Sequence, residues 1–80
     1  MKRMIYSVYL TEVGNDPLSV IKTYRDLTCL GLKDVKDKID SAPCILLETA
    51  NREEAELYKT SLEECGATVT ILSSAADHLS

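Results

Sequence analysis

The stretch DPLSVIKTYRDLTCLGLKDVKDKIDSAP, residues 16–43, decides the fold of this 80-residue chain. Asp16 followed by Pro17 is typical of a helix start, because Asp caps free backbone N–H groups and Pro is tolerated in the first turn. Apolar residues then recur at helical spacing on both sides of Gly31, until Pro43 ends the pattern. The stretch therefore predicts two short helices joined by a tight turn. They are expected over residues 17–28 and 32–41.

The first of these helices carries apolar residues on two sides. Its core stripe, the side that a sheet would bury, consists of Val20, Tyr24 and Leu27. Leu18 and Ile21 fall on another side, beside Lys22 and Arg25. Either the second helix covers Leu18 and Ile21, or the pair is exposed as a docking surface rimmed by cations. On the second view, we expect Ile21→Ala or Lys22→Glu to abolish partner binding with little loss of stability.

The rest of the chain predicts three strands and one more helix. The strands are expected at residues 4–10, 44–48 and 67–72, and the helix at 52–65, with Asn51 and Glu54 as a capping box and Gly66 at its end. In the second helix, Leu32, Val35 and Ile39 form the core stripe. The order β-α-α-β-α-β is that of an α+β, two-layer sandwich, with a three-stranded sheet and three helices on one face. Residues 1–72 are expected to form one domain and residues 73–80 a loosely ordered tail, and the strand order stays open.

Charge is uneven along the chain, whose net charge is −4. Residues 17–43 hold five basic and four acidic groups, a net charge of +1, whereas residues 44–72 hold two basic and six acidic groups, a net charge of −4. An acidic chain with one mildly basic side suits a protein partner with an acidic patch better than a nucleic acid. Direct nucleic-acid binding is therefore not expected.

Residue types that carry chemistry are sparse. The three cysteines, Cys29, Cys44 and Cys65, form no C-x-x-C pair, and the only histidine is His78. We therefore expect reduced thiols, a cytoplasmic location, no metal and no cofactor. No nucleophile has a base at a known spacing and no Gly-rich phosphate loop occurs, so an enzyme is not expected. No apolar run approaches the length of a membrane span.

Several segments together resemble a known family. They are V-I-K-x-x-R at 20–25, L-G-L-K-D-x-K at 30–36, S-A-P at 41–43 and EEAELYKTSLEECGATVTI at 53–71. This combination is similar to the C-terminal domain of the bacterial ribosomal stalk protein L7/L12, over about residues 5–71. The resemblance implies the same fold and a non-enzymatic function, which is to recruit translational GTPases to the ribosome. The partner-binding residues that it implies are Leu18, Ile21, Lys22, Arg25, Gly31, Leu32, Asp34 and Lys36.

The chain departs from that family in two ways that matter here. Cys29 stands where a Gly is usual, which makes the turn between the helices bulkier. The family's N-terminal dimerisation segment and flexible hinge are not seen in the 80 residues, so we expect a free-standing relative.

Other functions stay open beside factor binding. A peptide-binding protease adaptor has a similar fold, but it needs an acidic pocket and a His that this sequence does not place. A ribosome- or RNA-associated protein would need an open aromatic platform, for which only Tyr9 qualifies. A weak homodimer through Leu18 and Ile21 is a further alternative.

Overall fold

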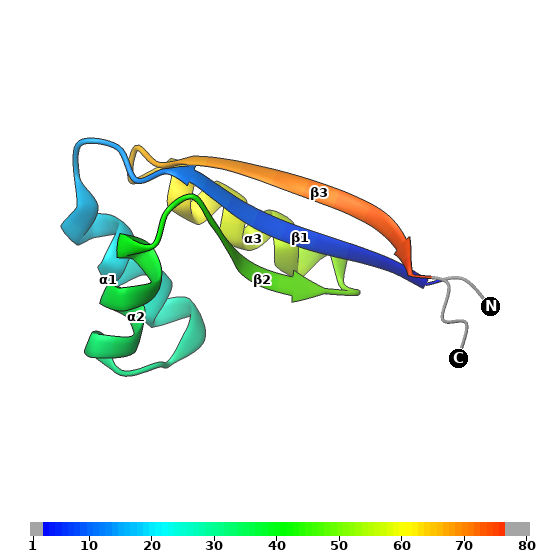
Figure 1. The fold of residues 1–80 in the computed structure, drawn as a ribbon, viewed down its shortest axis with the longest axis horizontal. Helices are drawn as coiled ribbons and strands as arrows, with labels where there is room; N and C mark the ends of the chain where they lie inside the picture. Colours follow the sequence, from blue (N-terminus) through cyan, green and yellow to red (C-terminus); the bar gives the residue numbers. More distant parts are fainter. Residues whose placement is uncertain (1–2, 77–80) are drawn as a thin grey trace.

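The computed structural model describes residues 3–76 as six elements around one sheet. In chain order they are β1 (Arg3–Glu12), α1 (Pro17–Thr28), α2 (Leu32–Asp40), β2 (Cys44–Thr49), α3 (Arg52–Glu63) and β3 (Thr68–Ala76). The strands form an antiparallel sheet in the order β2-β1-β3. α3 lies against all three strands, while α1 and α2 pack together at one end of the helical layer (Figure 1). The predicted α+β order is confirmed.

The core lies between β1 and the helices. Val8 and Leu10 of β1 are completely buried, as is Val20 of α1. The alternate residues Met4, Tyr6, Val8 and Leu10 of the first strand are all apolar, and this pattern predicts that their side faces the helices. The other buried apolar residues are Ile21, Tyr24, Val35, Ile39, Leu46, Ala55, Tyr58, Leu62, Ala67 and Val69.

The first and last strands of the chain, β1 and β3, are longer than expected. β1 begins at Arg3 and ends at Glu12, and β3 continues to Ala76 instead of stopping at Leu72. The added residues 73–76 of β3 pair with the start of β1, from Arg3 opposite Ala76 to Tyr6 opposite Ser73. Residues 73–76 are held to β1 by backbone hydrogen bonds and show no alternation of apolar and polar residues. The sequence pattern missed them because it relies on that alternation. The tail prediction is therefore wrong for residues 73–76, and residues 77–80 lie outside the described part.

Capping side chains set the beginning of each longer helix. The Asp16 carboxylate accepts hydrogen bonds from the Ser19 N–H at 3.2 Å and the Ser19 hydroxyl at 2.6 Å, and these bonds lower its pKa. The Asn51 side chain accepts from two N–H groups of α3, as the capping box predicted. The returning bond of the box differs, because the Glu54 carboxylate accepts from the Thr49 hydroxyl, which in turn accepts from the Asn51 N–H. α3 then ends at Glu63, two residues before the predicted end.

Candidate partner-docking site

A groove of about 390 Å³ lies between the outer sides of α1 and α2. Leu18 forms one wall and is 77% exposed, and Leu32 at the start of α2 forms another and is 54% exposed. The remaining lining residues are Ile21, Lys22, Arg25 and Asp26. The Asp16 cap and Pro17 fix where α1 begins, and therefore which side of the helix Leu18 occupies. The sequence placed most of these residues on one surface, and the structure brings them together around a hollow.

Ile21 differs from the prediction. It is only 7% exposed and belongs to the core cluster, so it forms the floor of the groove and not its exposed wall. At about 100° per residue, Ile21 lies about 60° from Tyr24 around the helix, close enough to share the buried side. The sequence left open whether Leu18 and Ile21 are covered or exposed. In the structure Leu18 is exposed and Ile21 is covered. The expectation that Ile21 lies off the core is therefore wrong, and Ile21→Ala is now predicted to lower the free energy of unfolding.

The turn between the helices also differs from the prediction. Cys29 has the left-handed conformation, with φ 60°, and its N–H donates to the Arg25 carbonyl oxygen at 2.8 Å. Gly31 instead has φ −68° and ψ 154°, a conformation that any residue adopts, and a side chain there would meet nothing within 4 Å. Gly31 is therefore not the residue that makes the turn, although the space above it is open to a partner.

α2 contributes less to the groove than the sequence predicted. Val35 and Ile39 are buried, but Leu32 leaves the expected core stripe and faces the groove. Asp34 and Lys36 are exposed on α2 and do not line the hollow. Asp26, which the prediction omitted, does line it, and its spacing of four from Lys22 was the available signal.

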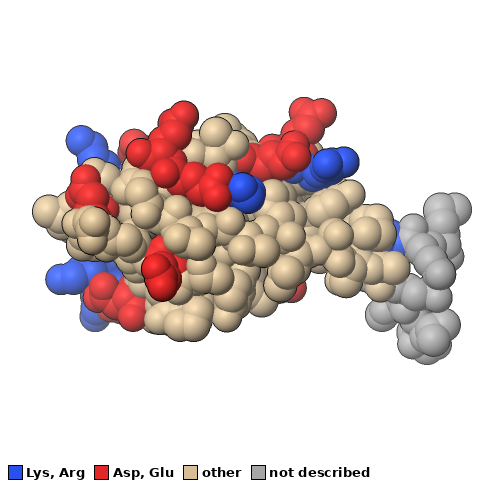
Figure 2. Space-filling view, turned by 90° about the horizontal axis from the view of Figure 1, so that it is seen from above, with Lys and Arg blue, Asp and Glu red and all other residues tan. Residues whose placement is uncertain are grey.

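The rim of the groove carries cations without ion-pair partners. Within residues 3–76 the ion pairs are Arg52 with Glu56 and Lys59 with Glu63, both on α3. Lys22 and Arg25 therefore remain available to carboxylates of another molecule. The acidic side chains Glu53, Glu54, Glu56 and Glu63 belong to α3 and not to this rim, and Figure 2 shows many of the acidic groups in that view along one long side of the molecule. The groove combines apolar walls, a buried apolar floor and two basic groups, and this combination is suited to an apolar protein segment flanked by acidic residues.

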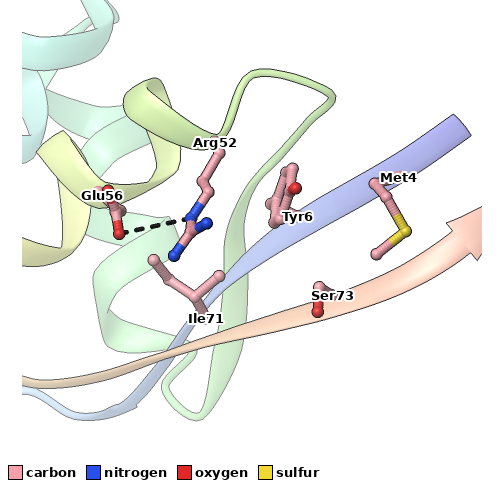
Figure 3. Close-up of a pocket in the computed structure, with 6 residues that line it drawn as sticks. All are labelled: Met4, Tyr6, Arg52, Glu56, Ile71 and Ser73. Atoms are coloured by element: carbon pink, nitrogen blue, oxygen red, sulfur yellow. Dashed lines mark ion pairs between the residues drawn. The ribbon is translucent and has the colours of Figure 1, made fainter.

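A second hollow of about 400 Å³ lies at the other end of the sheet. Its floor is formed by Tyr6 and Ile71, and Arg52 and Glu56 extend over it from the first turns of α3 (Figure 3). The Arg52 Nε lies 3.6 Å from the Glu56 carboxylate. No sequence pattern indicated this hollow, because Ser73, which lines it, belongs to the part of β3 that was not predicted as a strand.

The structure bears differently on the alternative functions. The groove rim holds Lys22 and Arg25 against the single carboxylate of Asp26, whereas an adaptor pocket would be acidic. Tyr9 lies half-buried on the open face of the sheet between its cross-strand neighbours Ile45 and Thr70.

Other kinds of site are not found in the described region. Residues 3–76 contain no group of three or more potential His, Cys, Asp or Glu metal ligands. In the same region, no helix has the length and apolar character needed to cross a bilayer.

Comparison with known proteins places the chain in a family. Residues 6–72 match the family model described as the ribosomal protein L7/L12 C-terminal domain. Proteins named large ribosomal subunit protein bL12 from Lachnospira eligens and Lactobacillus gasseri are each 50% identical over 66 residues. The protein of that name from Blochmanniella pennsylvanica is 48% identical over 66 residues. These alignments cover 82% of this chain and 54–55% of each relative, so the chain spans about half the length of the relatives that it matches. The chain belongs to the ribosomal protein L7/L12 C-terminal domain family.

Proposed function

We propose that this chain is a protein-docking module that binds translational GTPases through the groove between α1 and α2. The observation that carries the proposal is the pair of exposed leucines, Leu18 and Leu32, on either side of a buried floor. Large exposed apolar side chains that border a hollow are typical of docking sites. Family membership supports the choice of partner, because the matched relatives are named as ribosomal proteins.

The basic groups at the rim of the groove support a partner with an acidic surface and a complex that forms and dissociates quickly. Lys22 and Arg25 border the apolar walls without ion-pair partners in the described residues. They would attract an acidic surface over a distance and so raise the association rate, and Arg25 can hold a carboxylate with two hydrogen bonds. The apolar contact supplied by Leu18 and Leu32 is small, so we expect a fast complex of about micromolar affinity or weaker. The ribosome is a partner only through such factors in this proposal.

The test is a titration of the isotope-labelled chain with elongation factor G, followed by NMR. We expect the amide signals of α1, the 29–31 turn and the start of α2 to shift, and the affinity to fall as salt rises because the rim charges are exposed. Shifts spread over β2 and the open face of the sheet would contradict the proposed surface. An absence of shifts at about millimolar factor, a concentration at which even weak complexes form, would overturn the function itself.

Matched variants separate the groove from the rest of the surface. Leu18→Ala should weaken binding by about tenfold or more, because Leu18 supplies one of the two large apolar side chains in a small proposed interface. Leu57 is 55% exposed on α3, outside the groove, so Leu57→Ala removes a similar side chain as a control. Lys22→Glu should weaken binding and reverse its salt dependence, whereas Lys38→Glu, on α2 outside the groove, should change it little. Equal losses in test and control variants would mean that the groove is not the binding site.

A further inference from the structure

The start of α2 is held by fewer side chains than the starts of the other two helices. Asp16 caps α1 and Asn51 caps α3, whereas no side chain of the described residues caps α2, whose N-cap is Gly31. Leu32, the first residue of α2, is 54% exposed, so packing holds its side chain only in part. Because Leu32 forms a wall of the groove, the position of that wall depends on the turn that precedes it.

This turn, residues 29–31, contains a residue in an unfavourable backbone conformation. Cys29 has φ 60°, in the left-handed region where a Cβ atom meets steric resistance. A residue other than glycine keeps such a conformation only where its surroundings hold it there. The Cys29 N–H donates to the Arg25 carbonyl oxygen at 2.8 Å, but this bond joins backbone atoms and does not depend on the side chains nearby. The side chains around the turn therefore decide how firmly its conformation is held.

The Thr28 hydroxyl connects the two sides of Cys29. It donates to the Tyr24 carbonyl oxygen at 2.8 Å within α1, and it accepts from the Leu30 N–H at 3.4 Å. The first bond fixes the Thr28 side chain against α1, and the second joins that side chain to the backbone beyond the left-handed residue. A change of φ at Cys29 would carry the Leu30 N–H away from the hydroxyl oxygen. The two bonds together therefore favour the observed turn.

Tyr58 holds the last turn of α1 from a different element, α3. Its side chain is buried in the core, and its ring meets the Tyr24 ring edge-on with the centroids 6.3 Å apart. Its hydroxyl donates to the Leu27 carbonyl oxygen at 3.3 Å. Leu27 is among the last four residues of α1, whose carbonyl groups have no partner within the helix. The bond therefore ties the end of α1, next to the turn, to a helix that does not line the groove.

We propose that Thr28 and Tyr58 are positioning residues of the docking groove, which act through the 29–31 turn to hold Leu32 across the groove from Leu18. Neither Thr28 nor Tyr58 lines the groove, so neither is expected to touch a partner. Loss of either hydroxyl lets the turn leave its left-handed conformation and displaces Leu32, which lowers the fraction of molecules that present a complete groove. The effect on binding rests on the proposed function, whereas the effect on the turn rests on the hydrogen bonds alone.

The expected loss of affinity follows from the strength of one hydrogen bond. The apparent affinity of a partner falls in proportion to the fraction of molecules in the binding-competent conformation. One hydrogen bond changes such an equilibrium by a factor of about five to ten, which sets the upper limit for a single variant. We expect Thr28→Val or Tyr58→Phe to weaken the binding of elongation factor G about threefold. The double variant should weaken it about tenfold or more, because the second loss acts on a turn that is already less well held.

NMR of the free, isotope-labelled chain tests the turn without any partner. The three-bond coupling between the N–H and Hα protons of Cys29 reports its φ angle, and the methyl signals of Leu32 report the wall of the groove. Thr28→Val and Tyr58→Phe should shift or broaden the signals of residues 29–32, because the turn then exchanges between conformations. Thr28→Ser keeps the hydroxyl and should restore both the signals and the affinity of the parent chain.

The same helix offers a matched control for each variant. The Thr23 hydroxyl lies 3.1 Å from the Cys65 Sγ atom, and the Tyr24 hydroxyl donates to the Leu46 carbonyl oxygen at 2.7 Å. Thr23→Val and Tyr24→Phe therefore remove hydroxyls of the same kind whose partners lie away from the turn. Both controls should change the affinity by less than about twofold and leave the signals of residues 29–32 in place, even where they lower stability.

Three results would overturn the proposal. They are turn signals that stay unchanged in both Thr28→Val and Tyr58→Phe, a Thr28→Ser variant that behaves like Thr28→Val, and controls that lose as much affinity as the test variants. The salt dependence of binding should stay that of the parent chain, because Lys22 and Arg25 are untouched, and a changed dependence would also count against the proposal. A parent chain that does not bind the factor would overturn the proposed function instead, and the spectra of the free chain would still decide whether Thr28 and Tyr58 hold the turn.

Discussion

Replacing Ile21 by Ala separates the floor of the α1–α2 groove from its wall. Ile21 is 7% exposed within the core, whereas Leu18, one turn earlier on the same side of α1, is 77% exposed. Ile21→Ala removes three carbon atoms, worth about 0.8 kcal/mol each when buried. The partly closed cavity adds to that loss, so we expect the free energy of unfolding to fall by about 3 kcal/mol. Leu18→Ala should change it by less than about 0.5 kcal/mol.

This loss is large for a chain of 80 residues, whose total stability is about 4–12 kcal/mol. The melting temperature should fall by about 12–24 °C, at about 4–8 °C per kcal/mol for a domain of this size. Urea unfolding followed by circular dichroism measures the free energy directly, and an unchanged urea slope would show that the unfolded state is the same. An Ile21→Ala variant within about 0.5 kcal/mol of the parent chain, or a Leu18→Ala variant that loses as much as Ile21→Ala, would refute the division into floor and wall.

Three further changes test the turns and the core. Cys29→Gly should raise the free energy of unfolding by about 0.5 kcal/mol. Glycine removes the steric cost of the left-handed conformation at φ 60°, and this gain exceeds the stabilisation of the unfolded chain by its added conformational freedom. A lower free energy of unfolding in urea would contradict the prediction. Gly66→Ala should lower the free energy of unfolding by about 1–2 kcal/mol, because its φ of 92° is unfavourable for alanine. Gly14→Ala should lower it by about 1–3 kcal/mol more, because a Cβ atom there would overlap the Gly66 carbonyl oxygen. Equal losses of stability in the two variants on thermal unfolding would show that this turn can move. Tyr24→Phe should lose about 1 kcal/mol at neutral pH, since the Tyr24 hydroxyl donates to a buried carbonyl oxygen at 2.7 Å. Burial raises the pKa of Tyr24 above its ordinary 10.0, so its stabilisation is complete below pH 10 and is lost as pH rises through the folded-state pKa; urea unfolding of both proteins at neutral and alkaline pH should show the difference narrowing above pH 10.

The sequence predicted the order of elements because local signals mark nearly every boundary. Asp16 and Asn51 act as helix caps where expected, and Val8 and Leu10 lie on the buried side of β1 that the alternation assigned to the helices. The ends of β1 and β3 were missed because their pairing joins residues about 70 positions apart and needs no apolar side chains. Whether such strand ends pair depends on the partner strand and not on the local composition of either segment.

The residues that line the groove between α1 and α2 were predicted in part, for a related reason. Helical spacing alone placed Leu18, Lys22 and Arg25 on one surface, and in the structure these residues line one hollow. Helical spacing does not determine whether a neighbouring helix covers the residues at the edge of an apolar stripe. α2 and the core cover Ile21 and leave Leu32 outside, and that outcome depends on the packing of two helices against each other.

The groove and the β3 edge lie far enough apart to act independently. α1 and α2 stand at one end of a molecule 41 Å long, and the extension of β3 reaches the other end (Figure 1). Substitutions at distant sites without shared partners usually have additive effects. Leu72 on β3 is 52% exposed, so Leu72→Lys should bind elongation factor G with an unchanged dissociation constant. The double variant with Leu18→Ala should bind as weakly as Leu18→Ala alone. Isothermal titration of the four proteins measures the difference, and a loss of more than about threefold from Leu72→Lys would mean that the factor contacts the sheet edge as well.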